Sequence, residues 1–246
     1  MTDRGSIIAR RYLASALWIW FCILAFRGSA QSVHPSTGRH IPQVMGVGGA
    51  DWLDREERAR EEQPEKALAA LSLHPGMMVG DVGAGTGFYS IRIARRIAPG
   101  GIVYANDIQP GMLVRLRANA DEEGVRNIQT VLGSDRDARL PPGKLDLIVL
   151  VDVYHEFSQP RSMLDSMRAA LRPGGRLVLL EYRKEDANVP ILPAHKMSVK
   201  EVRMEVTPAG FSFVKVVDTL PMQHMIFFEK PKGQLAPPPD GTQLRR

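Results

Sequence analysis

The chain has 246 residues, of which 44% are hydrophobic and 24% are charged. This length and balance are those of one globular domain, and they exclude a disordered chain or a multi-span membrane protein. The formal net charge is +5 at pH 7, but the Arg and Lys residues alternate with Asp and Glu rather than gathering in one stripe. Nucleic-acid binding, which depends on a clustered basic surface, is therefore not expected.

The N-terminal segment has the composition of a signal that directs export. Three arginines precede an apolar run over residues 12–26, and small residues follow as far as Ala30. This order is typical of a secretory signal peptide, and the run is shorter than the roughly twenty residues that span a bilayer comfortably. We therefore predict that residues 1–30 are a signal peptide and that the protein is exported, to the periplasm or out of the cell. A permanent membrane anchor is the alternative.

Residues 31–72 are expected to form a linker and N-terminal helices. The part up to Gly49 is rich in Gly, Pro, Ser and Thr without a period, which indicates a linker or a loop laid over the domain. Asp51 is expected to cap a helix, and residues 52–62, mostly Glu and Arg, indicate a solvated helical face. A second helix is expected to open at Pro64. Neither helix shows obvious chemistry.

Beyond Gly76, short apolar runs alternate with helical segments, which is typical of βαβ units and a largely parallel sheet. The helices expected are 89–97, 111–123, 161–171 and a last one that ends at 209. The strands expected are 78–82, 102–106, 128–132, 145–151, 177–181, 213–219 and 224–229. The connection between the last two strands is so short that they must be antiparallel. The pattern therefore predicts an α/β domain over residues 73–230, with helices on both faces of the sheet, and a disordered Pro-rich tail over 231–246.

A glycine-rich turn stands where the first strand ends and a helix begins, over Asp81-Val82-Gly83-Ala84-Gly85-Thr86-Gly87. Glycines there let the backbone turn tightly and approach a ligand that a Cβ would exclude. Asp107 ends the next strand about twenty residues later, where a carboxylate accepts both hydroxyls of a ribose. A tight turn without a ligand is the alternative for the glycines alone, but Asp107 favours a nucleoside cofactor.

Dinucleotide-binding enzymes share both features, so the glycine spacing has to separate the two classes. A nicotinamide or flavin fingerprint requires G-x-G-x-x-G, but the third position is Phe88 when counted from Gly83 and Ser90 when counted from Gly85. Asp81 inside the strand is also unusual for a dehydrogenase. A sulfonium cofactor with an amino-acid tail would offer that carboxylate an ammonium group, so the motif favours methyl transfer over redox chemistry.

The order of these motifs resembles the class I S-adenosylmethionine-dependent methyltransferases over roughly residues 73–230. The glycine-rich turn resembles the family's first motif, and Asp107 its ribose-binding acid. Leu145–Val149 resembles the fourth strand, Leu171–Leu177 the turn before the fifth, and the final antiparallel pair the reversed seventh strand. The resemblance implies a Rossmann-like fold with a seven-stranded, mostly parallel sheet whose last strand is antiparallel. Within the family the chain is most similar to the small-molecule group that includes the ubiquinone-biosynthesis type.

The resemblance also implies which residues bind S-adenosyl-L-methionine. Asp107 would hold the ribose, and Asp81 would attract the ammonium group. Asp135, just after the third strand, lies near the family's adenine-binding acid, with Asp137 as the alternative. The glycines that would line the methionine and ribose parts of the cofactor are Gly83, Gly85 and Gly87.

The substrate candidates follow the later strands, because open parallel sheets bind ligands outside the carboxyl ends of their strands. Tyr154 and His155 follow the fourth strand, Glu181 ends the fifth, and His224 begins the antiparallel strand at the same edge. His195 lies in the Pro-rich loop before the last helix, which we expect to fold over the pocket. We therefore predict substrate contacts from Tyr154, Glu181, His195 and His224 and a catalytic role for His155.

Methyl transfer is an in-line displacement, so positioning of donor and acceptor supplies up to roughly 7–11 kcal/mol and no metal is required. A base helps when the acceptor is a phenol, a hydroxyl or an acidic carbon. Histidine side chains ordinarily titrate at about 6.5, so the residue type of His155 suits that role. Contact with the cofactor or capping of the next helix is the alternative for His155. Three histidines and Glu181 near one edge raise zinc as a further alternative, but their spacings fit no compact ligand motif.

The sequence thus predicts an S-adenosylmethionine-dependent methyltransferase that acts on a small-molecule or lipidic acceptor. A binding protein on the same fold without turnover is the main alternative, because intact cofactor motifs do not prove transfer. An oxidoreductase is disfavoured by the missing third glycine. Export is in tension with this function, because it removes the enzyme from the cytoplasmic pool of the cofactor. Any membrane association is expected through residues 1–30.

Overall fold

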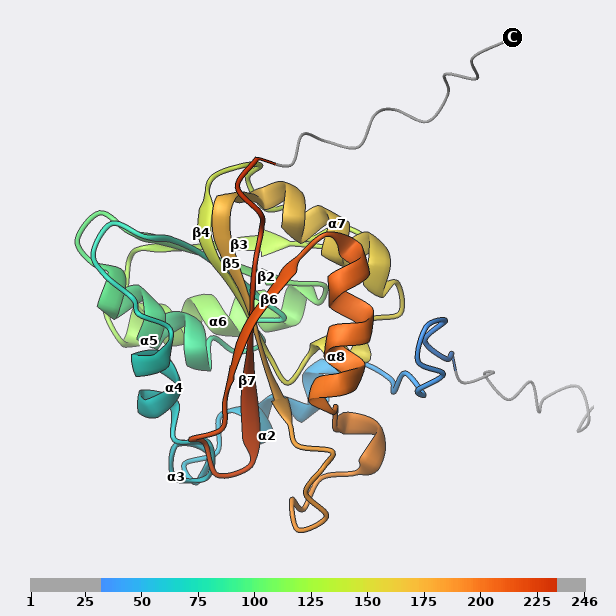
Figure 1. Ribbon diagram of the computed structural model, residues 1–246. Coiled ribbons are helices and arrows are strands. Elements are labelled where there is room, and N and C mark those ends of the chain that lie inside the picture. Colours follow the sequence, from blue (N-terminus) through green and yellow to red (C-terminus); the bar gives the residue numbers. More distant parts are fainter. Residues whose placement is uncertain (1–31, 234–246) are drawn as a thin grey trace, which may run out of the picture. The chain divides into compact units, whose positions relative to one another are not determined.

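The computed structural model describes residues 32–233 (Figure 1). The predicted signal peptide and all but the first three residues of the predicted tail lie outside this range. Within residues 32–233, no helix is long and apolar enough to cross a membrane.

Seven strands form one sheet in the order β3-β2-β1-β4-β5-β7-β6. The pairs among β1 to β5 are parallel, whereas β7 is antiparallel to both β5 and β6. Only β7 therefore runs against the other six strands, which confirms the predicted fold class. The strands are β1 (Met78–Val82), β2 (Ile102–Asp107), β3 (Ile128–Leu132), β4 (Leu145–Val151), β5 (Leu171–Tyr182), β6 (Ser212–Val217) and β7 (Gln223–Glu229).

Helices cover both faces of the sheet, as predicted (Figure 1). The helices that share the first core cluster are α4 (Pro64–Ala70), α5 (Phe88–Ile97) and α6 (Pro110–Glu122). The helices of the second cluster are α7 (Pro160–Ala170) and α8 (Val199–Val206). The central strands β1 and β4 are nearly continuous apolar runs because both of their faces are buried.

Proline and serine set most helix starts. Pro64, Pro110 and Pro160 occupy the first turns of α4, α6 and α7, where a missing N–H costs nothing and the fixed φ suits a helix. Ser198 caps α8 by accepting a hydrogen bond from the backbone N–H of Glu201, whose side chain in turn accepts from the N–H of Ser198. This helix ends at Val206 rather than at 209, and a 3-10 turn continues the chain.

The fifth strand starts at Leu171, six residues earlier than the predicted 177. Pro173 and the two glycines after it lie inside the strand, where its register with β4 shifts between Leu145 and Leu147. Gly174 has φ +76°, and its N–H donates to the carbonyl of Lys230. The segment predicted as a turn is therefore an irregular stretch of strand that still finds backbone partners.

The N-terminal helices differ from the prediction. Instead of one helical face over 52–62, the structure has a 3-10 turn η1 (Val47–Gly49) and two short helices, α2 (Ala50–Leu53) and α3 (Arg58–Glu62). The N-cap of α2 is Gly49, so Asp51 lies in the first turn and does not cap the helix.

Before these helices, the chain lies over the domain, one of the two arrangements expected for it. Arg39 is buried, and its guanidinium pairs with the carboxylate of Glu205 on α8, with Nε 2.9 Å from Oε1. Ile41 is buried as well. Segment 33–45 is thus fixed to the domain and leads into the pocket wall.

Candidate active site at the carboxyl edge of the sheet

A pocket of about 370 Å³ opens at the carboxyl ends of β1, β2, β3 and β4. Its walls come from the turns after these strands, from the N-terminal segment and from the loop before α8. The lining residues fall in the ranges 44–62, 81–89, 106–112, 134–135, 151–163, 182 and 190–195. Three separate parts of the chain therefore meet where a doubly wound sheet binds its ligands.

The glycine-rich turn forms the floor of the pocket through Gly83 and Gly85. Both have positive φ, and a Cβ on Gly83 would lie 2.4 Å from Cγ2 of Val153. Gly87 lies outside the pocket lining and is instead the N-cap of α5, at φ +93°. The turn is thus fixed by backbone conformation and by close packing, and only its first two glycines face the ligand space.

Asp107 lies beside this turn, and a backbone N–H donor holds each of its two carboxylate oxygens. Oδ2 accepts from the backbone N–H of Gly85 at 3.0 Å, and Oδ1 accepts from the N–H of Gln109 at 2.9 Å. Burial raises the pKa of this carboxyl, while the backbone donors oppose the rise. Each oxygen keeps a lone pair for a further donor, which suits the two hydroxyls of a ribose.

Asp81 also lines the pocket, although it is only 2% exposed. Its Oδ2 accepts from the hydroxyl of Ser90 at 2.6 Å. Burial raises the pKa of the Asp81 carboxyl to about 6, and the positive charge of Arg58 opposes this rise. A cation bound next to Asp81 would hold the carboxylate in its charged form.

Of the two acids considered after β3, Asp135 lines the pocket. Asp137 accepts instead from the hydroxyl of Ser166 at 2.7 Å and from the backbone N–H of Arg139 at 2.8 Å. Those contacts account for Asp137 as part of the loop structure, so Asp135 is the acid placed to reach a ligand.

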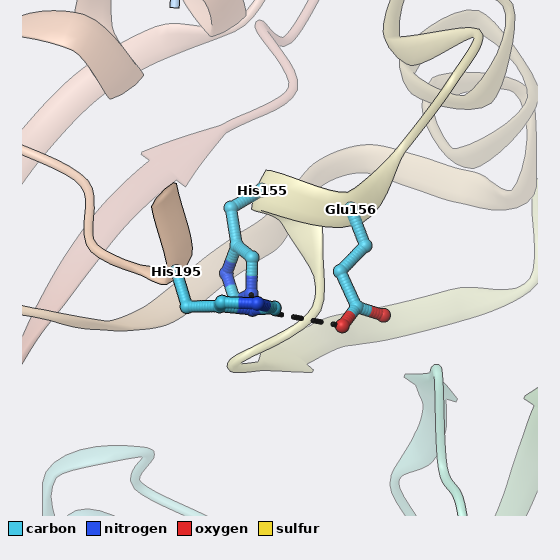
Figure 2. Close-up of side chains that lie close together, drawn as sticks. All are labelled: His155, Glu156 and His195. Carbon is cyan, nitrogen blue, oxygen red and sulfur yellow. Dashed lines mark hydrogen bonds and ion pairs between the residues drawn. The ribbon is translucent and has the colours of Figure 1, made fainter. Parts of the chain in front are cut away.

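Two histidines and one glutamate lie close together in the pocket lining (Figure 2). His155 and Glu156 lie on the 3-10 turn η2 (Tyr154–Glu156) after β4, and His195 lies on η3 (Pro193–His195). Nε2 of His155 is 3.1 Å from Nδ1 of His195, and Nδ1 of His155 is 2.6 Å from Oε2 of Glu181. The sheet edge therefore brings together His155 and His195, two of the residues predicted for chemistry.

Burial sets the protonation of this cluster. It raises the pKa of Glu156 to about 7, because the side chain is largely removed from water, while His155 opposes the rise. Burial also lowers the pKa of His195, and the neighbouring His155 adds to this. Both effects disfavour charge in the cluster when no ligand is present.

Three predicted substrate contacts lie away from the pocket. Glu181 and His224 face each other across the β5–β7 pair. Each lies two residues from a member of the second core cluster on its own strand, so both point to the face covered by α7 and α8. The ring of His224 contacts the carbonyl of Met197, at 2.9 Å from Nε2. Tyr154 is fully buried, beneath the guanidinium of Arg39. Glu181 reaches the site only through His155.

Sequence reasoning missed the contribution of the N-terminal helices. Arg58 and Glu62 line the pocket at 6% and 0% exposure, with Nε of Arg58 2.9 Å from Oε1 of Glu62. The run of Glu and Arg in which they stand predicts a solvated helical face instead. Their spacing of four residues, which permits an ion pair within one helix, was the one signal present.

Asp152, which the sequence places at this edge directly after the fourth strand, has φ +50° and also lines the pocket. Its Oδ2 accepts from the side-chain amide of Gln223, whereas its Oδ1 and Oε2 of Glu62 have no hydrogen-bond partner among the described residues. Burial raises the pKa of Asp152, and the negative charge of Glu62 adds to this. Buried oxygens without donors are expected where a ligand supplies the donor.

Comparison with known proteins gives the family. Residues 79–175 match a methyltransferase domain family. The chain is 34% identical over 180 residues to a ribosomal protein L11 methyltransferase of Thermus thermophilus, covering 72% of this chain and 63% of that protein. It is 31% identical over 113 residues to a ubiquinone/menaquinone biosynthesis C-methyltransferase of Ectopseudomonas mendocina, covering 46% of this chain and 44% of that protein. The chain thus spans less than two thirds of the length of either relative.

A solved structure supports the same assignment over a larger share of the chain. The structure of an S-adenosylmethionine-dependent methyltransferase from Aquifex aeolicus superposes with a TM-score of 0.72 at 26% identity, covering 76% of this chain and all of that one. The predicted family and cofactor are thereby confirmed.

The residues present also fit S-adenosylmethionine. The backbone at Gly83 and Gly85 is open to a ligand, Asp107 has lone pairs for ribose hydroxyls, and the acids near Asp81 lack donors that an ammonium group would supply. Residues 79–175 thus belong to a methyltransferase domain family, on the fold of the class I S-adenosylmethionine-dependent methyltransferases.

Proposed function

We propose that the protein transfers a methyl group from S-adenosylmethionine to a small apolar or lipidic acceptor. The observation that carries this proposal is the apolar mouth of the pocket. Large hydrophobic side chains are rarely left in water without a reason when they gather in one place. The pocket-lining residues of this kind, each between 37% and 71% exposed, are Val44, Met45, Trp52, Ile108 and Leu192.

We assign two different roles to the pocket residues, cofactor binding and acceptor binding. Asp81, Asp107 and the glycine turn would hold the cofactor, while the side chains around His155 would face the acceptor. When bound, the cofactor supplies a methyl carbon that bonds to the acceptor atom as its bond to sulfur breaks, with that electron pair going to sulfur. Glu181 holds Nδ1 of His155, and Nε2 of the same ring faces His195. A histidine that acts as a general base or as a metal ligand needs one ring nitrogen held in this way.

A methyl-transfer assay tests this function. The full chain is incubated with S-adenosylmethionine that carries a labelled methyl group. One set of reactions contains quinols, phenols or a lipid extract, and the other contains purified ribosomal protein L11. We expect label in the organic phase for at least one apolar acceptor and none in the protein. Label in the ribosomal protein alone would overturn the proposed acceptor class, and cofactor binding without any transfer would indicate a binding protein.

A matched pair of variants ties turnover to the site. Trp52→Ala removes an exposed side chain from the pocket mouth, and Val114→Ala removes one that is 64% exposed on α6, outside the pocket lining. We expect the Trp52 variant to raise KM for the apolar acceptor several-fold and the Val114 variant to leave it unchanged. Equal effects of the two substitutions would remove the apolar mouth as the acceptor site.

A further inference from the structure

The ligand-type atoms of His155, Glu156 and His195 lie within 4.8 Å of one another (Figure 2). The three side chains come from two segments about forty residues apart in sequence, η2 and η3, and all three line the pocket. Nδ1 of His195 is 3.9 Å from Oε1 of Glu156 and 3.1 Å from Nε2 of His155. His195 thus stands between the other two.

These separations are compatible with three ligands on one metal ion. Two nitrogens bound to one zinc ion at about 2.0–2.1 Å are about 3.3 Å apart at the tetrahedral angle. The two ring nitrogens are 3.1 Å apart, so little movement would place both on one ion. The carboxylate of Glu156 is somewhat farther away, but it sits on a side chain with three rotatable bonds.

A buried carboxylate stands behind one of these histidines. Glu181 is 0% exposed, accepts at Oε1 from the backbone N–H of Tyr154 at 3.0 Å, and places Oε2 2.6 Å from Nδ1 of His155. A carboxylate that holds one ring nitrogen fixes the tautomer, so that the other nitrogen keeps its lone pair for a metal. This arrangement of carboxylate, histidine and ion recurs in zinc sites.

The neighbouring cations do not compete for the cluster. Arg39 directs Nε and Nη2 to the carboxylate of Glu205 and Nη1 to the carbonyl of His155. Lys196, next in sequence to His195, points Nζ to the carbonyls of Asp186 and Val189. Neither cation therefore takes the place of a divalent ion beside His155, Glu156 and His195.

We propose that His155, Glu156 and His195 bind one divalent ion of the zinc class, with Glu181 as the positioning residue behind His155. The set differs from the one weighed on sequence grounds: His224 faces Met197, Glu181 lies behind a ligand, and Glu156 takes the third place. Three protein ligands leave a tetrahedral ion one open position, and here that position faces the pocket. His155 then acts as a ligand, not as the predicted base.

The metal site also restricts the chemical class of the methyl acceptor, and this step rests on the proposed methyl transfer. An ion with an open position binds an anionic oxygen or sulfur, so the fitting acceptors are phenols, enols or thiols that lose a proton on binding. The proton leaves to solvent, and the anion is held next to the cofactor side of the pocket.

Cobalt titration of the metal-free full chain tests the site directly. Co²⁺ in a tetrahedral site with nitrogen ligands absorbs visible light, and Zn²⁺ should abolish that absorption by displacing it. We expect one equivalent of Co²⁺ to bind the unmodified chain, His195→Ala to abolish the spectrum, and Glu181→Gln to weaken binding about 10–100-fold. His74→Ala, an exposed histidine outside the pocket, is the matched control and should leave the titration unchanged.

Several outcomes decide the proposal. No visible spectrum with the unmodified chain, or a spectrum that persists in His195→Ala, would overturn it. The His195 side chain is one-third exposed and lies outside the two core clusters, so circular dichroism should show the variant folded. Retained binding of S-adenosylmethionine would show that only the metal site is lost. Failure of the metal site would leave that cofactor binding intact, so the two claims are separable.

Discussion

At the scale of single residues, Asp81 shows a conflict between function and stability. The fold buries this carboxyl beside β1 with one side-chain donor, Ser90, and with Arg58 and Asp107 as its charged neighbours. Burial raises its pKa from 3.8 to about 6, so the folded state binds the proton more tightly than the unfolded state. Its contribution to stability is therefore fully present below pH 3.8 and is lost as pH rises through about 6.

Asp81→Asn should therefore stabilise the protein at neutral and alkaline pH. Removing a buried charge whose pKa is raised by about two units is expected to increase the free energy of unfolding by up to about 3 kcal/mol at pH 8, and by much less at pH 4. Urea denaturation at the two pH values measures this difference. A variant that is less stable than the parent at pH 8 would show that burial of the charged Asp81 carboxylate does not destabilise the folded protein.

Gly83→Ala should be more damaging than an alanine at another glycine of similar φ. Gly83 has φ +74°, and a Cβ there would lie 2.4 Å from Val153, whereas Gly76 has φ +86° with no atom within 4 Å of a Cβ. Gly76→Ala should lose about 1–2 kcal/mol from backbone strain alone, and Gly83→Ala clearly more. Thermal unfolding of both variants provides the comparison. Equal losses would show that Val153 moves aside freely.

At the scale of elements, one buried ion pair attaches segment 33–45 to α8. The guanidinium of Arg39 and the carboxylate of Glu205 are both nearly inaccessible, with side-chain exposures of 4% and 0%. His34 and Thr37 also contact Glu205, so several residues of the segment converge on one carboxylate. This attachment holds the chain that leads into the pocket wall.

Arg39→Ala should lower the free energy of unfolding by about 3–5 kcal/mol, because it leaves Glu205 buried without its main partner. Arg161→Ala breaks the exposed pair with Asp165 on α7 and should stay within about 0.5 kcal/mol of the parent. Chemical denaturation of both variants, side by side, measures the contrast. A small loss for Arg39→Ala would mean that segment 33–45 is not held by this contact.

Much of the fold follows from the sequence because its strands are buried runs. The observed β1, β3 and β4 have the predicted bounds, and the glycine turn, Asp107 and His155 reach the pocket because strand ends meet at one edge. The direction in which a side chain points is harder to predict from the sequence than the element that carries it. Glu181 was expected in the pocket, but strand alternation turns it to the other face. The run of charges around Arg58 predicts a solvated face, because such a run does not reveal which member will pack against a distant side chain, here the ring of Phe88.

At the scale of the whole molecule, the site depends on three parts of the chain that meet at one edge. The N-terminal segment supplies Arg58 and three of the five residues of the apolar mouth, the strand ends supply the cofactor acids, and the loop before α8 supplies His195 and Leu192. The strand ends carry the family's common motifs, whereas the other two parts carry the features specific to this chain. We therefore place substrate choice in residues 44–62 and 190–195.

Export through residues 1–30 is our proposal for where this molecule works. Fractionation of a bacterial host that makes the full chain with a C-terminal tag should recover the tag outside the cytoplasmic membrane. N-terminal sequencing should then begin near Gln31, and a variant lacking residues 1–30 should remain in the cytoplasm. Recovery of the uncleaved chain in the membrane would favour an anchor, and an uncleaved chain in the cytoplasm would contradict export.

The central claim is that the pocket binds S-adenosylmethionine through Asp107 and the glycine turn. Calorimetry of the full chain with S-adenosylmethionine, with NADH as the competing ligand, measures this most directly. The account predicts binding in the micromolar range, lost in Asp107→Ala and kept in Asp165→Ala, whose carboxylate lies exposed on α7. Absence of binding to the unmodified chain, equal binding by the Asp107 variant, or a preference for NADH would contradict it.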